Sequence, residues 1–238
     1  MTTHGKIIVA MSSSFNPHYD SLSAPQRLLW AELADVPPEF TLYGGTAVAL
    51  HLGHRQSIDF DFFSPNEVSP DKLYHQIAFL KNAKIIQQEK NTLTCLVDRN
   101  GPVKISFFGL PHLHCIGTPH IVAENKLKVA SLIDLAGMKA AVVQQRPEAK
   151  DYIDLDAIMS AGVTLPTALA AAKVIYGPSF NPQITLKALS YFEDGDLHML
   201  PDDMKTRIVK AVAATNLNQL PILKATYSNS TGNSGVSA

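Results

Sequence analysis

The stretch Tyr43–Phe63, YGGTAVALHLGHRQSIDFDFF, contains two adjacent glycines near its start and an Asp-Phe-Asp sequence near its end. FTLYGG at 40–45 is typical of a strand that runs into a glycine turn. TAVALHLG at 46–53 predicts a short helix, and SIDFDFF at 57–63 predicts a second strand. The order strand, glycine turn, helix, strand is therefore the unit from which the fold is inferred.

The second strand is predicted to be amphipathic, because side chains at positions i and i+2 of a strand share a face. Asp59 and Asp61 then point together, and the opposite, core-facing side carries Ile58, Phe60 and Phe62. Two neighbouring carboxylates repel each other unless a proton or a cation relieves them. Mg²⁺ is a suitable partner because it prefers carboxylate oxygens together with substrate phosphates. The alternative is an exposed strand face with two solvated aspartates.

The glycine turn predicts a second feature next to the carboxylates. A turn that leads directly into a helix exposes backbone N–H groups at the positive end of the helix dipole, where phosphate binds well. Gly44 and Gly45 occupy this position, although glycines also form plain tight turns. The combination predicts a phosphate cradle beside a metal site.

The remaining pattern predicts an α+β fold with a mixed sheet and flanking helices in the first half and helices in the second. Helices are expected over 23–36 and 69–82, and helical pattern runs from Lys126 to about Thr215. Further strands are expected over 83–90, 92–99 and 103–108, the last two joined by an Asn-Gly turn. The expected organisation is a possibly flexible N-terminus over 1–20, a core over 21–122, a helical region over 123–215 and a disordered tail over 216–238.

Composition excludes several classes of protein. Twenty Lys and Arg against 21 Asp and Glu leave a net charge of −1, so no global basic field indicates nucleic-acid binding. Two distant cysteines do not form a disulfide framework and fit a reducing cytosol. No apolar run approaches the ~20 residues that a membrane-spanning helix needs. We expect a cytoplasmic protein with no membrane partner.

The segment at 44–65, GGTAVALHLGHRQSIDFDFFSP, resembles the signature of the AbiEii/AbiGii-type nucleotidyltransferases of the polymerase-β-like superfamily. Many members are toxins of bacterial toxin–antitoxin systems. The resemblance implies a polymerase-β-like core, in which Asp59 and Asp61 hold Mg²⁺ or Mn²⁺. It also implies binding of the nucleoside triphosphate substrate by Gly44, Gly45, Thr46, Arg55 and Ser57.

A second segment, LIDLAGMKAAVVQQRPEAKDYIDLDAI at 132–158, is similar to another motif of the same family. Lys139 lies in a helix that is apolar nearly all round, where its amine must reach water or an anion. By the resemblance Lys139 contacts nucleotide phosphates, and Asp151 is the family's other functional acid. Asp154 is interpreted as a structural residue that pairs with Lys139.

The superfamily has a third carboxylate on a neighbouring strand, and alternation in VKISFF at 103–108 puts Ser106 at that position. Serine is no general base at neutral pH and a weak metal ligand. The leading hypothesis is transfer of a nucleoside monophosphate to an acceptor hydroxyl, with RNA as the acceptor and an antitoxin protein as a partner. The alternatives are a catalytically inactive nucleotide-binding module that acts through a protein partner and a metal-dependent phosphohydrolase.

Overall fold

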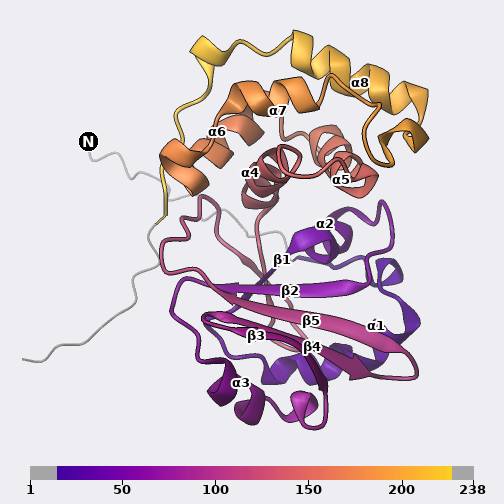
Figure 1. The fold of residues 1–238 in the computed structure, drawn as a ribbon, viewed down its shortest axis with the longest axis vertical. Helices are drawn as coiled ribbons and strands as arrows, with labels where there is room; N and C mark the ends of the chain where they lie inside the picture. The colour runs from indigo at the N-terminus through magenta and orange to yellow at the C-terminus, as the bar shows by residue number, and fades with distance from the viewer. Residues whose placement is uncertain (1–14, 227–238) are drawn as a thin grey trace, which may run out of the picture.

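The Asp-Phe-Asp strand lies inside a mixed sheet of seven strands in the computed structural model, which describes residues 15–226. The strand order is β3-β4-β5-β2-β1-β7-β6 (Figure 1). The strands are β1 Thr41–Tyr43, β2 Asp59–Ser64, β3 Lys84–Glu89, β4 Thr92–Asp98, β5 Pro102–Gly109, β6 His120–Ile121 and β7 Lys128–Val129. Together with the helices they confirm the predicted α+β class.

Strand β2 pairs with β1 in antiparallel and with β5 in parallel orientation. The register sets Asp59 beside Lys104 and Asp61 beside Ser106 of β5. Pairing with β5 therefore confirms which strand is the neighbour of the Asp-Phe-Asp strand, and it places Ser106 directly next to Asp61.

The apolar face of β2 packs into the core, as the alternation predicted. Phe60 and Phe62 are fully buried, and the ring of Phe62 stacks on that of Phe107 in β5. Trp30, in the 3-10 helix η2 (Trp30–Asp35), brings its ring centroid to 6.3 Å from that of Phe60. Ile58 corrects the prediction, because it is 64% exposed: β2 begins one residue later, so the alternation does not extend to this position.

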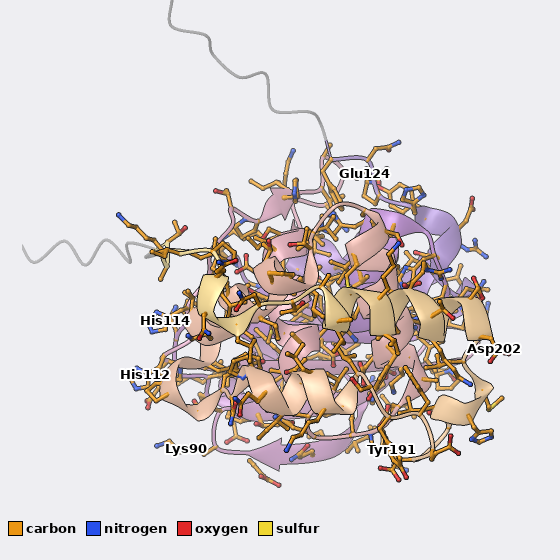
Figure 2. All side chains as sticks on the ribbon, turned by 90° about the horizontal axis from the view of Figure 1, so that it is seen from above. Lys90, His112, His114, Glu124, Tyr191 and Asp202 are labelled. Carbon is orange, nitrogen blue, oxygen red and sulfur yellow. The ribbon has the colours of Figure 1, made fainter. Side chains whose placement is uncertain are left out.

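Helices cover both faces of the sheet. Helices α1 (Ala24–Leu29) and α3 (Pro70–Gln76) lie on the core-facing side with Trp30. Helix α2 (Gly44–Leu52) lies on the other side, between the sheet and a helical layer (Figure 1). That layer contains α4 Leu132–Val142, α5 Ala149–Ser160, α6 Leu165–Tyr176, α7 Pro182–Ala188 and α8 Asp202–Ala213. Figure 2 looks down on this layer, with Asp202 marking the start of α8.

Local signals located the helix starts better than the helix lengths. Ser23 accepts a hydrogen bond from the backbone of Gln26 in a capping box at the start of α1, as Ser-Ala-Pro predicts. The single helix expected over 23–36 is divided into α1 and η2. The helix expected over 69–82 ends at Gln76 and is followed by a 3-10 turn, Ala78–Leu80.

The beginning of the predicted helical region is wrong in one respect. Strand β7 at Lys128–Val129 joins the sheet beside β1, and the first helix of this half begins only at Leu132. Two residues of sequence are too few for periodicity to distinguish a strand from a helix. The boundary at residue 122 stays a prediction, and β7 shows that the sheet extends beyond it.

The terminal predictions are also partly corrected. Residues 15–20 are anchored, since the backbone N–H of His18 donates to Leu50 O at 2.8 Å. At the other end, Leu217–Gln219 form a 3-10 turn and Thr226 pairs with Cys115 through a backbone hydrogen bond, so 216–226 are not a disordered tail. The rest of both predictions, 1–14 and 227–238, falls outside the described residues.

Across the described residues, no single helix is long and apolar enough to cross a membrane. One pair of helices, α5 and Leu165–Ser179, meets the length and apolarity criteria together, but the two are bent by 116° relative to each other.

Candidate functional site

The candidate site lies where β2 and β5 face the helical layer. Its first part, which we call the carboxylate face, consists of Asp59 and Asp61 on β2 with Lys104 and Ser106 on β5. The two aspartates and Lys104 are partly exposed, whereas Ser106 is buried. Lys104 Nζ lies 2.9 Å from Asp59 Oδ2. The structure thus brings the two predicted metal ligands together on one face, with a lysine as an additional neighbour.

The ionised form of Asp61 is disfavoured at this face. Burial is the main cause that raises its pKa above the ordinary value, and the neighbouring carboxylate of Asp59 raises it further. The charges of Lys104 and Lys139 and hydrogen bonding by Ser106 lower this pKa, but they do not cancel the increase. An additional cation at this face would therefore be favourable.

The glycine turn approaches the carboxylate face closely. Gly44 has φ +71°, and a Cβ on it would lie 2.5 Å from Asp61 Oδ2. A Cβ on Gly45 would lie 2.4 Å from the Nη2 atom of Arg55 and 3.1 Å from Ser57 Oγ. Gly44 needs glycine for its backbone conformation, and at both positions an added Cβ would force a neighbouring side chain to move. The predicted phosphate-binding residues Gly45, Arg55 and Ser57 lie together at the start of α2.

Thr46 was predicted to contact phosphate, but its side chain lies in the protein interior. Its hydroxyl donates a hydrogen bond to the backbone oxygen of Asp59. This bond ties the first turn of α2 to the first residue of β2. Thr46 is thereby a link between the glycine turn and the Asp-Phe-Asp strand, and its contact with phosphate stays a prediction.

The second part of the site is a group of charged side chains that we call the ion-pair cluster: Arg55, Lys139, Asp151 and Asp154. Lys139 Nζ lies 2.7 Å from Asp151 Oδ1 and 2.6 Å from Asp154 Oδ2. Both carboxylates are completely buried and Lys139 is nearly so. The buried lysine therefore reaches anions, as its apolar helix required, and it joins α4 to α5.

Arg55 completes the cluster from the other half of the chain. Its Nε donates to Asp154 Oδ1 at 2.6 Å and its Nη2 to Oδ2 at 2.8 Å. His54 Nε2 lies 2.7 Å from the same Oδ1. Burial alone would raise the pKa of Asp154, but the bonds from His54 and Arg55 and the charge of Lys139 outweigh it and hold that pKa well below its usual range. Asp154 is a structural residue that pairs with Lys139, and it also holds Arg55.

Sequence reasoning missed two cations of this region, Lys104 and Arg146. Arg146 Nε donates to Asp151 Oδ2 at 2.8 Å, from the loop between α4 and α5. The position of Lys104 followed from the same alternation that singled out Ser106, two residues further along the strand. Its ion pair with Asp59 depends on the register between β2 and β5, which the local pattern does not define.

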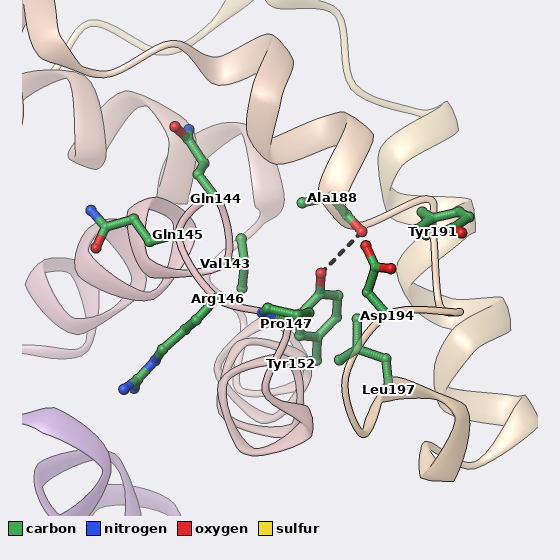
Figure 3. Close-up of a pocket in the computed structure, with 10 residues that line it drawn as sticks. All are labelled: Val143, Gln144, Gln145, Arg146, Pro147, Tyr152, Ala188, Tyr191, Asp194 and Leu197. Carbon is green, nitrogen blue, oxygen red and sulfur yellow. Dashed lines mark hydrogen bonds between the residues drawn. The ribbon is translucent and has the colours of Figure 1, made fainter.

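Arg146 also borders a pocket of about 170 Å³ within the helical layer. Tyr152 donates to the backbone oxygen of Ala188 at 3.0 Å inside this pocket. Figure 3 shows that the Arg146 side chain points out of the pocket, away from Tyr152. The pocket lining shares no residue with the carboxylate face, and Arg146 both borders the pocket and pairs with Asp151.

Similar proteins identify the family of this chain. The family model described as "Nucleotidyl transferase AbiEii toxin, Type IV TA system" matches residues 27–218. The chain belongs to the AbiEii family. An uncharacterised protein of Aquifex aeolicus (strain VF5) is 35% identical over 159 residues, which cover 66% of this chain and 75% of that protein.

Two solved structures share the fold of this AbiEii member. MenT4, a nucleotidyltransferase toxin from Mycobacterium tuberculosis H37Rv, gives a TM-score of 0.55 at 13% identity, over 81% of this chain and 83% of that one. A candidate nucleotidyltransferase from H. pylori gives a TM-score of 0.54 at 14% identity, over 79% of this chain and 92% of that one. The predicted polymerase-β-like nucleotidyltransferase fold is consistent with these neighbours.

Proposed function

We propose that this AbiEii protein is a Mg²⁺-dependent nucleotidyltransferase that moves a nucleoside monophosphate from a nucleoside triphosphate to an acceptor hydroxyl and releases pyrophosphate. The observation that carries the proposal is the shared face of Asp59 and Asp61, set against Gly44 at the start of α2. Two carboxylates beside a helix N-terminus combine a cation site with a phosphate site. Membership of the AbiEii family supports the reaction class.

The donor set fits Mg²⁺ or Mn²⁺. Both ions prefer hard oxygen ligands, and Mg²⁺ is commonly held by one or two carboxylates together with substrate phosphates. Asp59 and Asp61 would hold the ion, and its binding would be favoured because burial and the neighbouring Asp59 carboxylate both raise the pKa of Asp61. Once bound, the ion supplies positive charge to the phosphate oxygens.

The protein's own cations are arranged around the same place. Arg55 lies against Gly45 and Ser57, where a phosphate at the start of α2 would meet its guanidinium. Lys139 is held by Asp151 and Asp154, and its charge already acts on Asp61. Phosphoryl-type transfer depends mainly on positioning and charge stabilisation, which such groups provide. In the proposed reaction, Lys139 neutralises phosphate charge, and Asp151 orients either Lys139 or the acceptor.

The proposed biological role is the toxin of a toxin–antitoxin pair, because the matching family is described as a type IV system. RNA, such as a tRNA end, is the proposed acceptor, and the antitoxin protein is the proposed partner. The expected cytoplasmic location belongs to the same proposal. An antitoxin gene immediately upstream is the expected genetic context.

One observation favours a second candidate function. Ser106 occupies the position beside Asp61 where a third carboxylate is expected, and a hydroxyl cannot replace it as a general base at neutral pH. The second candidate is an inactive module that binds a nucleotide and acts through a protein partner. Calorimetry with nucleoside triphosphates separates the two, since tight binding without pyrophosphate release in the presence of RNA supports the inactive module.

The direct test incubates the purified protein with labelled triphosphates, Mg²⁺ and total RNA. We expect label in RNA with the wild type and none with the double variant Asp59→Ala/Asp61→Ala. The matched control is Asp35→Ala/Asp71→Ala, which removes two exposed aspartates outside the site and should leave labelling unchanged. Labelling that survives in Asp59→Ala/Asp61→Ala overturns the mechanism, and release of free monophosphate without any acceptor indicates a phosphohydrolase.

A further inference from the structure

The carboxylate face already contains a positively charged side chain, that of Lys104. β2 and β5 run parallel and in register, so Lys104 stands beside Asp59 as Ser106 stands beside Asp61. The Lys104 ammonium lies 2.9 Å from Asp59 Oδ2, and 42% of its side chain and 33% of that of Asp59 are exposed. The contact is therefore at the open surface of the site, where a nucleotide or a metal ion can reach both groups.

The charges at this face limit how many divalent ions it can take. Two carboxylates and one ammonium leave a net charge of −1. One divalent ion brings the face to +1, whereas two would bring it to +3. Sites that hold two ions against a phosphate need enough carboxylate oxygens to bind both. Here the fourth side chain of the face is the hydroxyl of Ser106, which adds no negative charge.

We propose that Lys104 takes the place of a second metal ion, so that the site binds one divalent cation and Lys104 supplies the second positive charge to the nucleotide phosphates. The inference rests on the proposed function. A lysine ammonium is a compact point charge with three donors, and it is a common phosphate ligand. Asp59 orients this ammonium through their ion pair. A metal ion at Asp59 shares that carboxylate with it, and the ammonium is then directed to the phosphate oxygens.

The proposal predicts opposite effects of Lys104 on metal binding and on transfer. Since like charges repel, removal of the ammonium in Lys104→Ala should strengthen Mn²⁺ binding about tenfold. The same variant should lose transfer activity on the order of 10²-fold at saturating Mg²⁺, because a charge aimed at the phosphates is gone. If Lys104 were a surface lysine without a role in the site, its removal would change neither Mn²⁺ affinity nor transfer activity.

The experiment is a Mn²⁺ titration of the full chain, in which free Mn²⁺ is measured by electron paramagnetic resonance. It is carried out with Mn²⁺ alone and with a non-hydrolysable nucleoside triphosphate analogue. We expect one Mn²⁺ per chain and analogue in the wild type. Lys104→Met, which keeps the apolar stem, should show the same tighter Mn²⁺ binding as Lys104→Ala, and Lys104→Arg should resemble the wild type. Lys84→Ala, on the exposed edge strand β3 of the same sheet, is the matched control.

The outcomes separate this inference from the proposed function. Two Mn²⁺ per chain in the wild type, or unchanged Mn²⁺ affinity in both Lys104→Ala and Lys104→Met, overturns the role of Lys104 even when RNA labelling succeeds. One Mn²⁺ per chain with tighter binding in both variants supports it, and this readout does not depend on turnover. Failure of RNA labelling, with the metal titration as expected, contradicts only the transferase proposal.

Discussion

The carboxylate face and the ion-pair cluster use the same residue types, but their electrostatic states are opposite. At the carboxylate face, burial and a like charge raise the pKa of Asp61, so its ionised form is poorly stabilised. In the ion-pair cluster, Asp154 is completely buried, and yet its pKa is lowered because Arg55, His54 and Lys139 surround it. The negative charge of Asp154 is therefore already balanced by neighbouring cations, whereas an additional cation at the carboxylate face would stabilise ionised Asp61.

The difference also assigns the two regions different tasks. The ion-pair cluster ties the loop after α2 to helices α4 and α5 through Arg55, Lys139 and Asp154. Such a contact fixes the positions of Arg55 and Lys139 and contributes to folding. At the carboxylate face, by contrast, the ionised form of Asp61 is poorly stabilised, and this is the face that we propose binds the metal ion. A variant confined to one region can therefore reveal whether the other responds.

The largest effect is expected for Asp154→Asn, which removes one charge from the ion-pair cluster. Lys139 and Arg55 would lose a buried carboxylate, and breaking a buried pair by removing one partner costs about 3–5 kcal/mol. Urea denaturation at pH 7 measures this loss. Because the folded-state pKa of Asp154 is lowered, its contribution is present above the unfolded pKa and disappears as pH falls through the folded value. The gap between wild type and variant should therefore close in strong acid.

Asp35→Asn is the control for this variant, since it changes an exposed aspartate and should leave the free energy of unfolding unchanged. If Asp154→Asn lowered the free energy of unfolding no more than Asp35→Asn, the ion-pair cluster would contribute nothing to stability. The contrast between the cluster and the carboxylate face would then be wrong.

A smaller effect is expected for Gly44→Ala, which acts on the carboxylate face. The positive φ costs an alanine about 1–2 kcal/mol, and its Cβ would displace the Asp61 carboxylate from 2.5 Å away. We expect weaker Mn²⁺ binding together with a modest loss of stability. Gly162→Ala is the matched control, because Gly162 also has a positive φ but a Cβ added there would meet no atom within 4 Å. Equal Mn²⁺ affinities in the two variants would separate Gly44 from the metal site.

The smallest effect is expected for Asp61→Asn, and it has the opposite sign. Because the folded-state pKa of Asp61 is raised, its ionised form destabilises the protein once pH exceeds the unfolded value of 3.8. The variant should therefore melt roughly 2–4 °C higher at pH 7 without divalent ions, and no higher at pH 3. Calorimetry with and without Mg²⁺ measures this, since Mg²⁺ should stabilise only the wild type. A lower melting temperature at pH 7 would mean that Asp61 is already satisfied.

The sequence predicted those parts of the site that depend on local pattern. Alternation placed Asp59 and Asp61 on one face of their strand, and it put Ser106 on the side of β5 that adjoins them. The glycine turn followed from Gly44 and Gly45, and the positive φ of Gly44 explains why that position favours glycine. The predicted burial of Ile58 was wrong, because alternation does not show where a strand begins.

The contacts that join distant segments could not be predicted in the same way. Arg55 and Asp154 are 99 residues apart, and nothing near Arg55 in the sequence indicates its partner. The ion pair of Lys104 with Asp59 depends on the register between β2 and β5, which local sequence pattern does not define. β7 is only two residues long, too short for any periodicity.

This short strand has a consequence for how the chain can be divided. Leu42 of β1 pairs with Val129 of β7, and three residues later the chain enters α4, the helix that carries Lys139. A fragment that ends before β7 would leave an edge of β1 open and expose the fully buried Leu42. Neither half is therefore a self-contained building block. Recombination with a relative would have to exchange β7 and the helices after it together, since β7 pairs with β1 and leads directly into α4.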